Sequence, residues 1–115
     1  MTDRNFLFVC SQNKLRSPTA EHIFADVEGV HTLSAGTNSG AEEKLSDELV
    51  AWAHVIFVME AAHRTKLRKR HRAALKEQRV IVLGIPDDYE YMDPELVALL
   101  KDRVGRWLPV AGIAE

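Results

Sequence analysis

The only cysteine of this 115-residue sequence lies near its start, a short distance before an arginine. Cys10 follows the apolar run "FLFV" and is separated from Arg16 by five residues, in the order "FLFVCSQNKLRSP". A single cysteine can form neither an internal disulfide nor a zinc site made of several thiolates, so Cys10 is either a small buried side chain or a reactive thiol. A thiolate is a strong nucleophile, and a guanidinium can hold two phosphate oxygens at once. The pair therefore predicts chemistry on a phosphate group.

The segment "CSQNKLR" is expected to be a loop that ends in a helix N-terminus. Ser17 and Pro18 are typical of the first turn of a helix. The unpaired backbone N–H groups of such a turn, together with the positive end of the helix dipole, form a site for a phosphate-sized anion. The same field favours the ionised form of the thiol.

The residues of this loop are predicted to form a phosphate cradle. Asn13 tolerates the left-handed backbone that a tight ring of inward-pointing amides needs. The Ser17 hydroxyl could donate to the sulfur or cap the helix, and both roles stay open. The predicted phosphate-binding residues are Ser11, Gln12, Asn13, Lys14, Leu15, Arg16 and Ser17.

Four short apolar runs alternate along the chain with four segments of helical spacing. The runs cover residues 6–9, 31–35, 55–59 and 79–83, and helices are expected from 17, over 46–53, over 61–77 and from 94. Three of the runs are continuous rather than alternating, which is typical of parallel strands covered on both faces. Right-handed crossovers then give one α/β domain, residues 1–115, with a doubly wound four-stranded sheet. Ligands of such sheets bind beyond the carboxyl ends of the strands, which places Cys10 at the mouth of the expected site.

Four segments resemble the low-molecular-weight protein tyrosine phosphatases. They are "FVCSQNKLRSPTAE", "SAGT" at 34–37, "WAHVIFVME" at 52–60 and "IPDDY" at 85–89, and together they span nearly the whole chain. The resemblance implies a three-layer, flavodoxin-like (phosphotyrosine phosphatase I-like) fold with strand order 2-1-3-4. It also implies a phosphomonoester hydrolase without metal or other cofactor, foremost a protein tyrosine phosphatase, that works through a phosphocysteine. Cys10 would be the nucleophile, Arg16 the phosphate clamp and the amides of 11–16 the cradle.

A phosphatase of this kind needs a proton donor for the leaving group, and a base for the water that later hydrolyses the phosphocysteine. The resemblance implies Asp87 for both steps, although Asp88 stays open as an alternative. Asp93 precedes Pro94 and is better explained as a helix cap. Tyr89 is predicted either to wall the substrate cleft or to pack the loop.

The sequence departs from the family pattern at three places. Gln12 stands where most members have glycine, and Leu15 stands where many have a second cysteine, so the protective disulfide is absent. The segment 38–44 is short and lacks the cleft wall and the histidine that in the family braces the loop serine. A wider or shallower site is therefore expected, and this leaves tyrosine specificity open. Lys14 adds positive charge at the rim and favours a substrate with more than one anionic group.

A basic run, "HRTKLRKRHR" at 63–72, contrasts with the formal net charge of -2. Such runs usually form a solvated helix face, and the alternative is docking to an acidic partner such as a phosphorylated protein or RNA. The run lacks the interleaved aromatic residues of single-strand binders, which disfavours nucleic acid. No stretch of the sequence predicts a membrane span or a signal peptide, so a cytoplasmic location is expected.

Three other functions fit the same loop and stay open at this point. A phosphatase of nucleotides, RNA or other small phosphorylated molecules would make use of the basic run. An arsenate reductase would need an external thiol, because Leu15 replaces the usual second cysteine. A non-catalytic module would bind phosphate through the loop without releasing a product.

Overall fold

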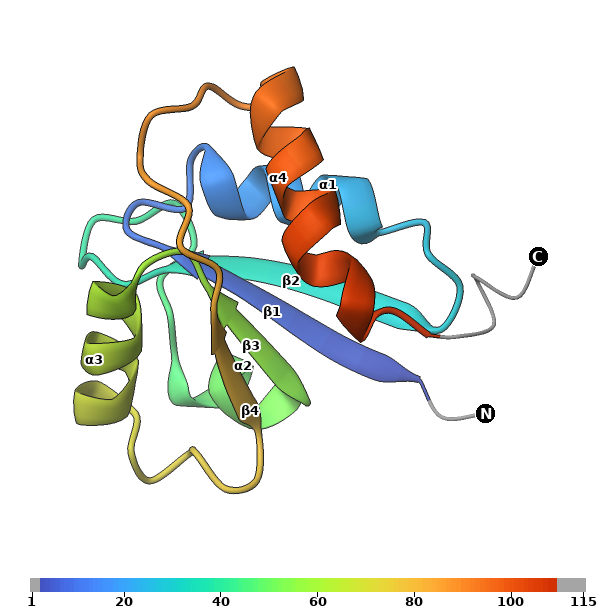
Figure 1. The fold of residues 1–115 in the computed structure, drawn as a ribbon. Helices are drawn as coiled ribbons and strands as arrows, with labels where there is room; N and C mark the ends of the chain where they lie inside the picture. The colour runs from blue at the N-terminus through green and yellow to red at the C-terminus, as the bar shows by residue number, and fades with distance from the viewer. Residues whose placement is uncertain (1–2, 110–115) are drawn as a thin grey trace.

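The computed structural model describes residues 3–109 and contains a four-stranded parallel sheet with helices on both faces (Figure 1). The strands are β1 (Arg4–Cys10), β2 (Val30–Gly36), β3 (Val55–Val58) and β4 (Arg79–Val82), and they lie in the order β2-β1-β3-β4. The helices are α1 (Arg16–Phe24), α2 (Asp47–Trp52), α3 (Ala61–Arg70) and α4 (Pro94–Val104), followed by the 3-10 turn η1 (Gly105–Trp107). The predicted fold class and strand order are thereby confirmed.

Each face of the sheet has its own apolar core, because side chains alternate between the faces along a strand. On one face, Phe6, Phe8 and Phe57 pack with apolar side chains of α1 and α4. Their neighbours in the same strands, among them Leu7 and Ile56, pack on the other face with side chains of α2 and α3. All five side chains are fully buried, and burial of each stabilises the fold by roughly 1.5–3 kcal/mol.

Capping side chains account for where α2 and α4 begin. The Ser46 hydroxyl accepts a 3.2 Å hydrogen bond from the backbone N–H of Leu49, and the Asp93 carboxylate accepts one of 2.9 Å from that of Glu95. Caps of this kind each contribute about 1 kcal/mol to stability. Asp93 therefore caps α4, as its place before Pro94 predicted.

The prediction that the third helix runs to Glu77 is wrong, because α3 ends at Arg70. Backbone N–H groups of Ala74 and Leu75 donate to the carbonyl of His71 and turn the chain after the helix. Ala74 and Leu75 then pack against the core that α2 and α3 cover. Burial of these two side chains outweighs their helix propensity, so the basic run is divided between α3 and a turn.

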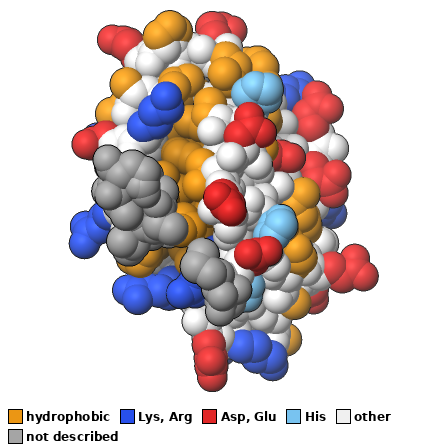
Figure 2. Space-filling model, turned by 90° about the vertical axis from the view of Figure 1, so that its right-hand side faces the viewer, with side chains coloured by type: hydrophobic (Ala, Val, Ile, Leu, Met, Phe, Trp, Pro, Cys, Tyr) orange, Lys and Arg blue, Asp and Glu red, His pale blue; other side chains and the backbone are white. Residues whose placement is uncertain are grey.

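The residues that could take part in catalysis lie at one end of the sheet, where three of the parallel strands have their carboxyl ends. β1 ends at Cys10, Glu60 follows β3, and Asp87 lies in the loop after β4. The opposite end of the sheet, where the strands begin, faces the viewer in Figure 2, which shows a band of apolar side chains with acidic and basic ones scattered around it. None of the helices in residues 3–109 has the length and apolar character that a membrane span requires.

Candidate active site

The loop from Cys10 to Arg16 connects β1 to α1 and turns back on the sulfur. Asn13, in the middle of the loop, has a φ of 57°, which is the left-handed conformation predicted for it. This turn directs the backbone N–H of Asn13 to the Cys10 sulfur, at 3.3 Å. The conformation of the loop therefore follows from a residue type that tolerates positive φ.

The side chain of Asn13 ties the loop to its surroundings. Its Nδ2 donates to Ser17 Oγ in α1 and to Ser34 Oγ in β2, each at 2.9 Å. Its Oδ1 accepts the backbone N–H of Glu43 at 3.1 Å. Because both amide hydrogens and the oxygen of Asn13 are used, the side chain has one satisfied orientation, and the loop is held before any ligand arrives.

Cys10 is buried, yet its sulfur has polar neighbours. Ser17 Oγ lies 3.0 Å from Sγ, and it also lies 3.4 Å from the carbonyl oxygen of Ala35. A hydroxyl has one hydrogen, so Ser17 can donate to the carbonyl while the thiol is protonated and to the sulfur once it is ionised. No side chain caps the N-terminus of α1. Of the two roles predicted for Ser17, contact with the sulfur is the one observed.

Five backbone N–H groups of the loop donate to no other group within residues 3–109, namely those of Ser11, Gln12, Lys14, Leu15 and Arg16. They lie beside the N-terminus of α1, where the helix dipole is positive. Unpaired N–H groups in this position are suited to an anion. The loop thus has the donors that could hold a phosphate group.

Arg16 is almost fully buried, with 2% of its side chain exposed, so its charge needs partners. Nη1 donates to Glu60 Oε1 at 3.0 Å and to the carbonyl oxygen of Ile85 at 2.8 Å. Nε lies 3.6 Å from Asp87 Oδ1. A guanidinium has five N–H donors, so these contacts orient the group and still leave donors for a ligand.

A pocket of about 150 Å³ opens at the Cys10 sulfur. Its lining consists of Cys10, Ser11, Gln12, Lys14, Leu15, Arg16 and Asp87. Asp88 and Tyr89 are not among these residues, and Tyr89 is half-buried against the apolar core. Asp87 is therefore the carboxylate at the pocket. Within residues 3–109, no group of three or more His, Cys, Asp or Glu side chains is arranged to hold a metal ion.

Gly36 marks the closest approach of β2 to the loop. A Cβ at this position would lie 2.5 Å from the carbonyl oxygen of Ser11 and 3.0 Å from the backbone nitrogen of Asn13, so only glycine fits. One residue later, the N–H of Thr37 donates to the carbonyl of Cys10 at 2.9 Å. The "SAGT" segment is thus packed directly on the loop.

A histidine braces the loop serine, contrary to the expectation drawn from the short 38–44 segment. His63, in the first turn of α3, has its Nε2 2.9 Å from Ser11 Oγ. Its Nδ1 accepts the backbone N–H of Glu60 at 3.0 Å. A neutral imidazole has one N–H, so the hydrogen lies on Nε2 and His63 donates to Ser11. The hydroxyl hydrogen of Ser11 is then free for another acceptor.

The environment of His63 keeps this imidazole neutral. Burial, followed by the positive charge of Arg16, lowers the pKa of His63 from 6.5 to about 4. A second proton would also have to sit on Nδ1, where the Glu60 N–H already donates. The arrangement of His63, Ser11 and Glu60 is therefore kept at neutral pH.

We expect the free energy of unfolding to fall as the pH drops from 6.5 towards about 4. In this window the unfolded state binds a proton on His63 and the folded state does not, so acid favours unfolding. One such group contributes a slope of at most about 1.4 kcal/mol per pH unit. Urea unfolding at a series of pH values measures the slope, and His63→Gln should reduce it. Identical slopes for the two proteins would contradict the lowered pKa.

Comparison with known proteins found likenesses in fold among solved structures. No protein-family model matches the sequence, and no curated protein matches it at a significant level. Among solved structures, the YwlE arginine phosphatase from Geobacillus stearothermophilus is similar over 90% of this chain and 92% of its own, at 22% identity and a TM-score of 0.72. The tyrosine phosphatase Wzb from Escherichia coli K30, solved with phosphate, is similar over 93% and 96%, at 22% identity and a TM-score of 0.72.

A third solved structure resembles the chain more completely. SP-PTP, a low molecular weight protein tyrosine phosphatase from Streptococcus pyogenes, matches 96% of this chain and 97% of its own, at 14% identity and a TM-score of 0.78. Its elements therefore correspond to those described here almost throughout. The chain has the fold of the low-molecular-weight protein tyrosine phosphatases.

Proposed function

We propose that the protein is a cysteine-dependent phosphomonoester hydrolase that acts on phosphorylated proteins, foremost on phosphotyrosine. The observation that carries this proposal is the single pocket shared by the Cys10 sulfur, the Arg16 guanidinium and the Asp87 carboxylate. The likeness in fold to tyrosine and arginine phosphatases supports it. A lone thiol that must stay reduced suits a cytoplasmic location.

In the first step the Cys10 thiolate attacks phosphorus, and the bond between phosphorus and the leaving oxygen breaks. Arg16 and the free loop amides donate hydrogen bonds to the other phosphate oxygens, which carry the developing charge. Asp87, in its protonated form, gives its proton to the leaving oxygen. The products of this step are the free alcohol or phenol and a phosphocysteine.

In the second step water releases the phosphate. Asp87, now a carboxylate, takes a proton from the water that attacks phosphorus. The bond between sulfur and phosphorus breaks, and the sulfur leaves as a thiolate. The Ser17 hydroxyl, 3.0 Å from Sγ, can donate to this thiolate and lower the cost of its departure.

Hydrolysis of p-nitrophenyl phosphate in the presence of a chelator tests the proposed function. We expect steady release of nitrophenol and phosphate that the chelator does not change, because no step above needs a metal. Binding of phosphate without turnover would instead indicate a non-catalytic module. Thiol consumption in proportion to added arsenate, without phosphatase activity, would indicate an arsenate reductase.

We expect Asp87→Asn to slow the reaction by about 100-fold or more, since an amide can neither give nor take the proton. The loss should be greatest for substrates with poor leaving groups, because these depend most on protonation. Steady-state kinetics on aryl phosphates of graded leaving-group pKa measure the effect. Asp88→Asn, a matched change one residue away, is the control. A larger loss in Asp88→Asn would assign the proton transfer to that residue instead.

A further inference from the structure

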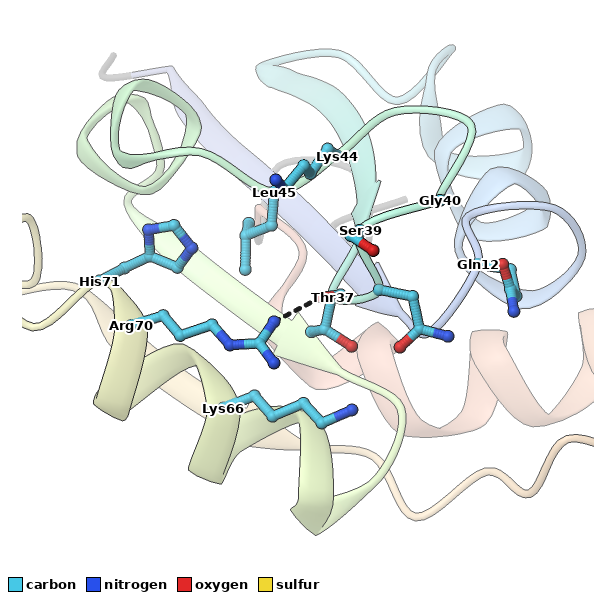
Figure 3. A pocket seen from close by; sticks show the side chains of 10 residues that line it. Gln12, Thr37, Ser39, Gly40, Lys44, Leu45, Lys66, Arg70 and His71 are labelled. Atoms are coloured by element: carbon cyan, nitrogen blue, oxygen red, sulfur yellow. Dashed lines mark hydrogen bonds between the residues drawn. The ribbon is translucent and has the colours of Figure 1, made fainter.

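A second, larger cavity adjoins the pocket at Cys10. It has a volume of about 750 Å³ and shares Gln12 with the pocket at Cys10. Its lining consists of Gln12, Thr37, Asn38, Ser39, Gly40, Lys44, Leu45, Lys66, Arg70 and His71, which we call the basic groove (Figure 3). Three of these side chains are Lys or Arg, and none is Asp or Glu. The groove is therefore an electropositive extension of the candidate active site.

Helix α3 links the two cavities along one of its faces. Glu60, just before the helix, contacts Arg16, and His63, in its first turn, contacts Ser11. Lys66 and Arg70 follow His63 at spacings of three and seven residues, which places them on the same helix face further from the sulfur. Arg70 lies about 10 Å beyond His63 along the helix axis.

Arg70 is already positioned across the groove. Its Nη1 donates to the carbonyl oxygen of Thr37 at 2.7 Å, which is the dashed line in Figure 3. One such bond leaves further N–H donors of the guanidinium available. The side chain of Lys66 extends beside it and forms no ion pair within residues 3–109. Two cations thus converge on one part of the groove.

The hydroxyl group of Thr37, in the same part of the groove, lacks a hydrogen-bond partner among the described residues. The residue is 3% exposed. Buried hydroxyls are almost always paired. In Figure 3 the Thr37 side chain lies on the wall that faces Arg70 and Lys66. An acceptor atom bound between these two cations would also suit the Thr37 hydroxyl.

We propose that the basic groove binds a second anionic side chain of a phosphoprotein substrate, best a second phosphate, while the first phosphate occupies the pocket at Cys10. This inference rests on the proposed function. A protein segment fits better than a nucleotide, since no Phe, Tyr or Trp lines the groove to stack on a base, and the ring of His71 is already held by Asp47 at 2.7 Å. An extended chain advances about 3.3 Å per residue, so anionic residues three positions apart span about the 10 Å that separate His63 from Arg70 along α3.

Synthetic peptides test the proposal. One peptide carries phosphotyrosine alone, and two others add phosphoserine three residues before or after it; a nucleoside 3′,5′-bisphosphate serves as the non-peptide arm. We expect one doubly phosphorylated peptide to show a kcat/KM about tenfold above that of the singly phosphorylated peptide, from charge-assisted contacts. The advantage should shrink as salt is raised, because the groove is open to solvent.

Two variants of α3 separate the groove from the general charge of the helix. Lys66→Gln removes a charge from the groove, and Lys69→Gln removes one from an exposed position outside it. We expect Lys66→Gln to lower the preference for the doubly phosphorylated peptide about fivefold and Lys69→Gln to leave this preference in place. An equal effect of both variants would overturn the proposal.

The native protein distinguishes failure of this inference from failure of the proposed function. If the protein hydrolyses the aryl phosphate and the singly phosphorylated peptide but gains nothing from a second phosphate, that result overturns the proposed role of the basic groove and leaves the proposed phosphatase activity standing. A preference for the nucleoside bisphosphate over every peptide also overturns the assigned occupant. Absence of hydrolysis of every substrate, the aryl phosphate included, overturns both.

Discussion

Cys10→Ser should lower phosphatase turnover by at least about 10⁴-fold, as removal of the nucleophile does in other covalent catalysts. A serine hydroxyl ionises far less readily than a thiol, and the nearest polar groups, Ser17 and Asn13, are not bases. The substitution replaces one atom, so the side chain becomes slightly smaller and the Ser17 hydroxyl remains beside it. Steady-state hydrolysis of p-nitrophenyl phosphate measures the loss.

Binding and stability measurements show whether that loss is chemical. The loop amides and Arg16 remain in Cys10→Ser, so inorganic phosphate should still bind with similar affinity by calorimetry. Urea unfolding should change little, because sulfur and oxygen occupy the same position beside α1. Turnover within about tenfold of the native rate would show that Cys10 is not the nucleophile.

Arg16→Lys should have the second largest effect, a loss of about 10³-fold in kcat/KM, comparable to removal of other donors that stabilise transition-state charge. Lysine is a point charge and cannot hold two phosphate oxygens with a planar fork. It also cannot keep the contacts of Arg16 with both Glu60 and the carbonyl of Ile85 while reaching a substrate. Kinetics on p-nitrophenyl phosphate, with inorganic phosphate as inhibitor, measure the loss.

A matched control for this variant is Arg72→Lys. Arg72 is exposed beyond the end of α3, so the same chemical change there should leave kcat/KM near the native value. Unfolding curves of Arg16→Lys check that the buried substitution has not unfolded the protein. If the Arg16→Lys variant is folded and has a near-native kcat/KM, the guanidinium of Arg16 does not stabilise the transition state.

Much of the fold could be predicted because strand and loop signals agree along the chain. The continuous apolar runs at β1 and β3 indicated buried parallel strands, and Asp93 before Pro94 marked the start of α4. The end of α3 could not be predicted, since residues 71–77 contain neither glycine nor proline and are turned by tertiary packing of Ala74 and Leu75. Helix propensity depends on nearby residues in the sequence, so it does not predict this tertiary packing.

The candidate site was predictable where one segment carries it and not where distant segments meet. Cys10, Asn13 and Arg16 belong to one short loop whose residue types imply its shape. His63 was missed because its contact with Ser11 joins residues 52 positions apart. The sequence did contain a sign that His63 lies near the site. Glu60 and His63 are three residues apart at the start of a helix that follows a strand, so both lie at the end of the sheet where Cys10 is found.

The basic groove was out of reach for a similar reason. The sequence shows only that basic residues are dense between 63 and 72. The helical positions of α3 divide them into a set facing the groove, Lys66 and Arg70, and a set on the outer side, Arg68 and Lys69. This division depends on where the helix contacts the segment after β2, which no local pattern records.

The central claim, that Cys10 carries the phosphate during turnover, is tested most directly by identifying the phosphorylated residue. p-Nitrophenyl phosphate has a leaving group that needs little protonation, whereas hydrolysis of the phosphocysteine needs a base, so Asp87→Asn should accumulate the phosphorylated form. Rapid denaturation of the reaction, followed by peptide mapping with mass spectrometry, should find phosphate on Cys10. Phosphate on another side chain, or turnover with no covalent phosphate at all, would contradict the account.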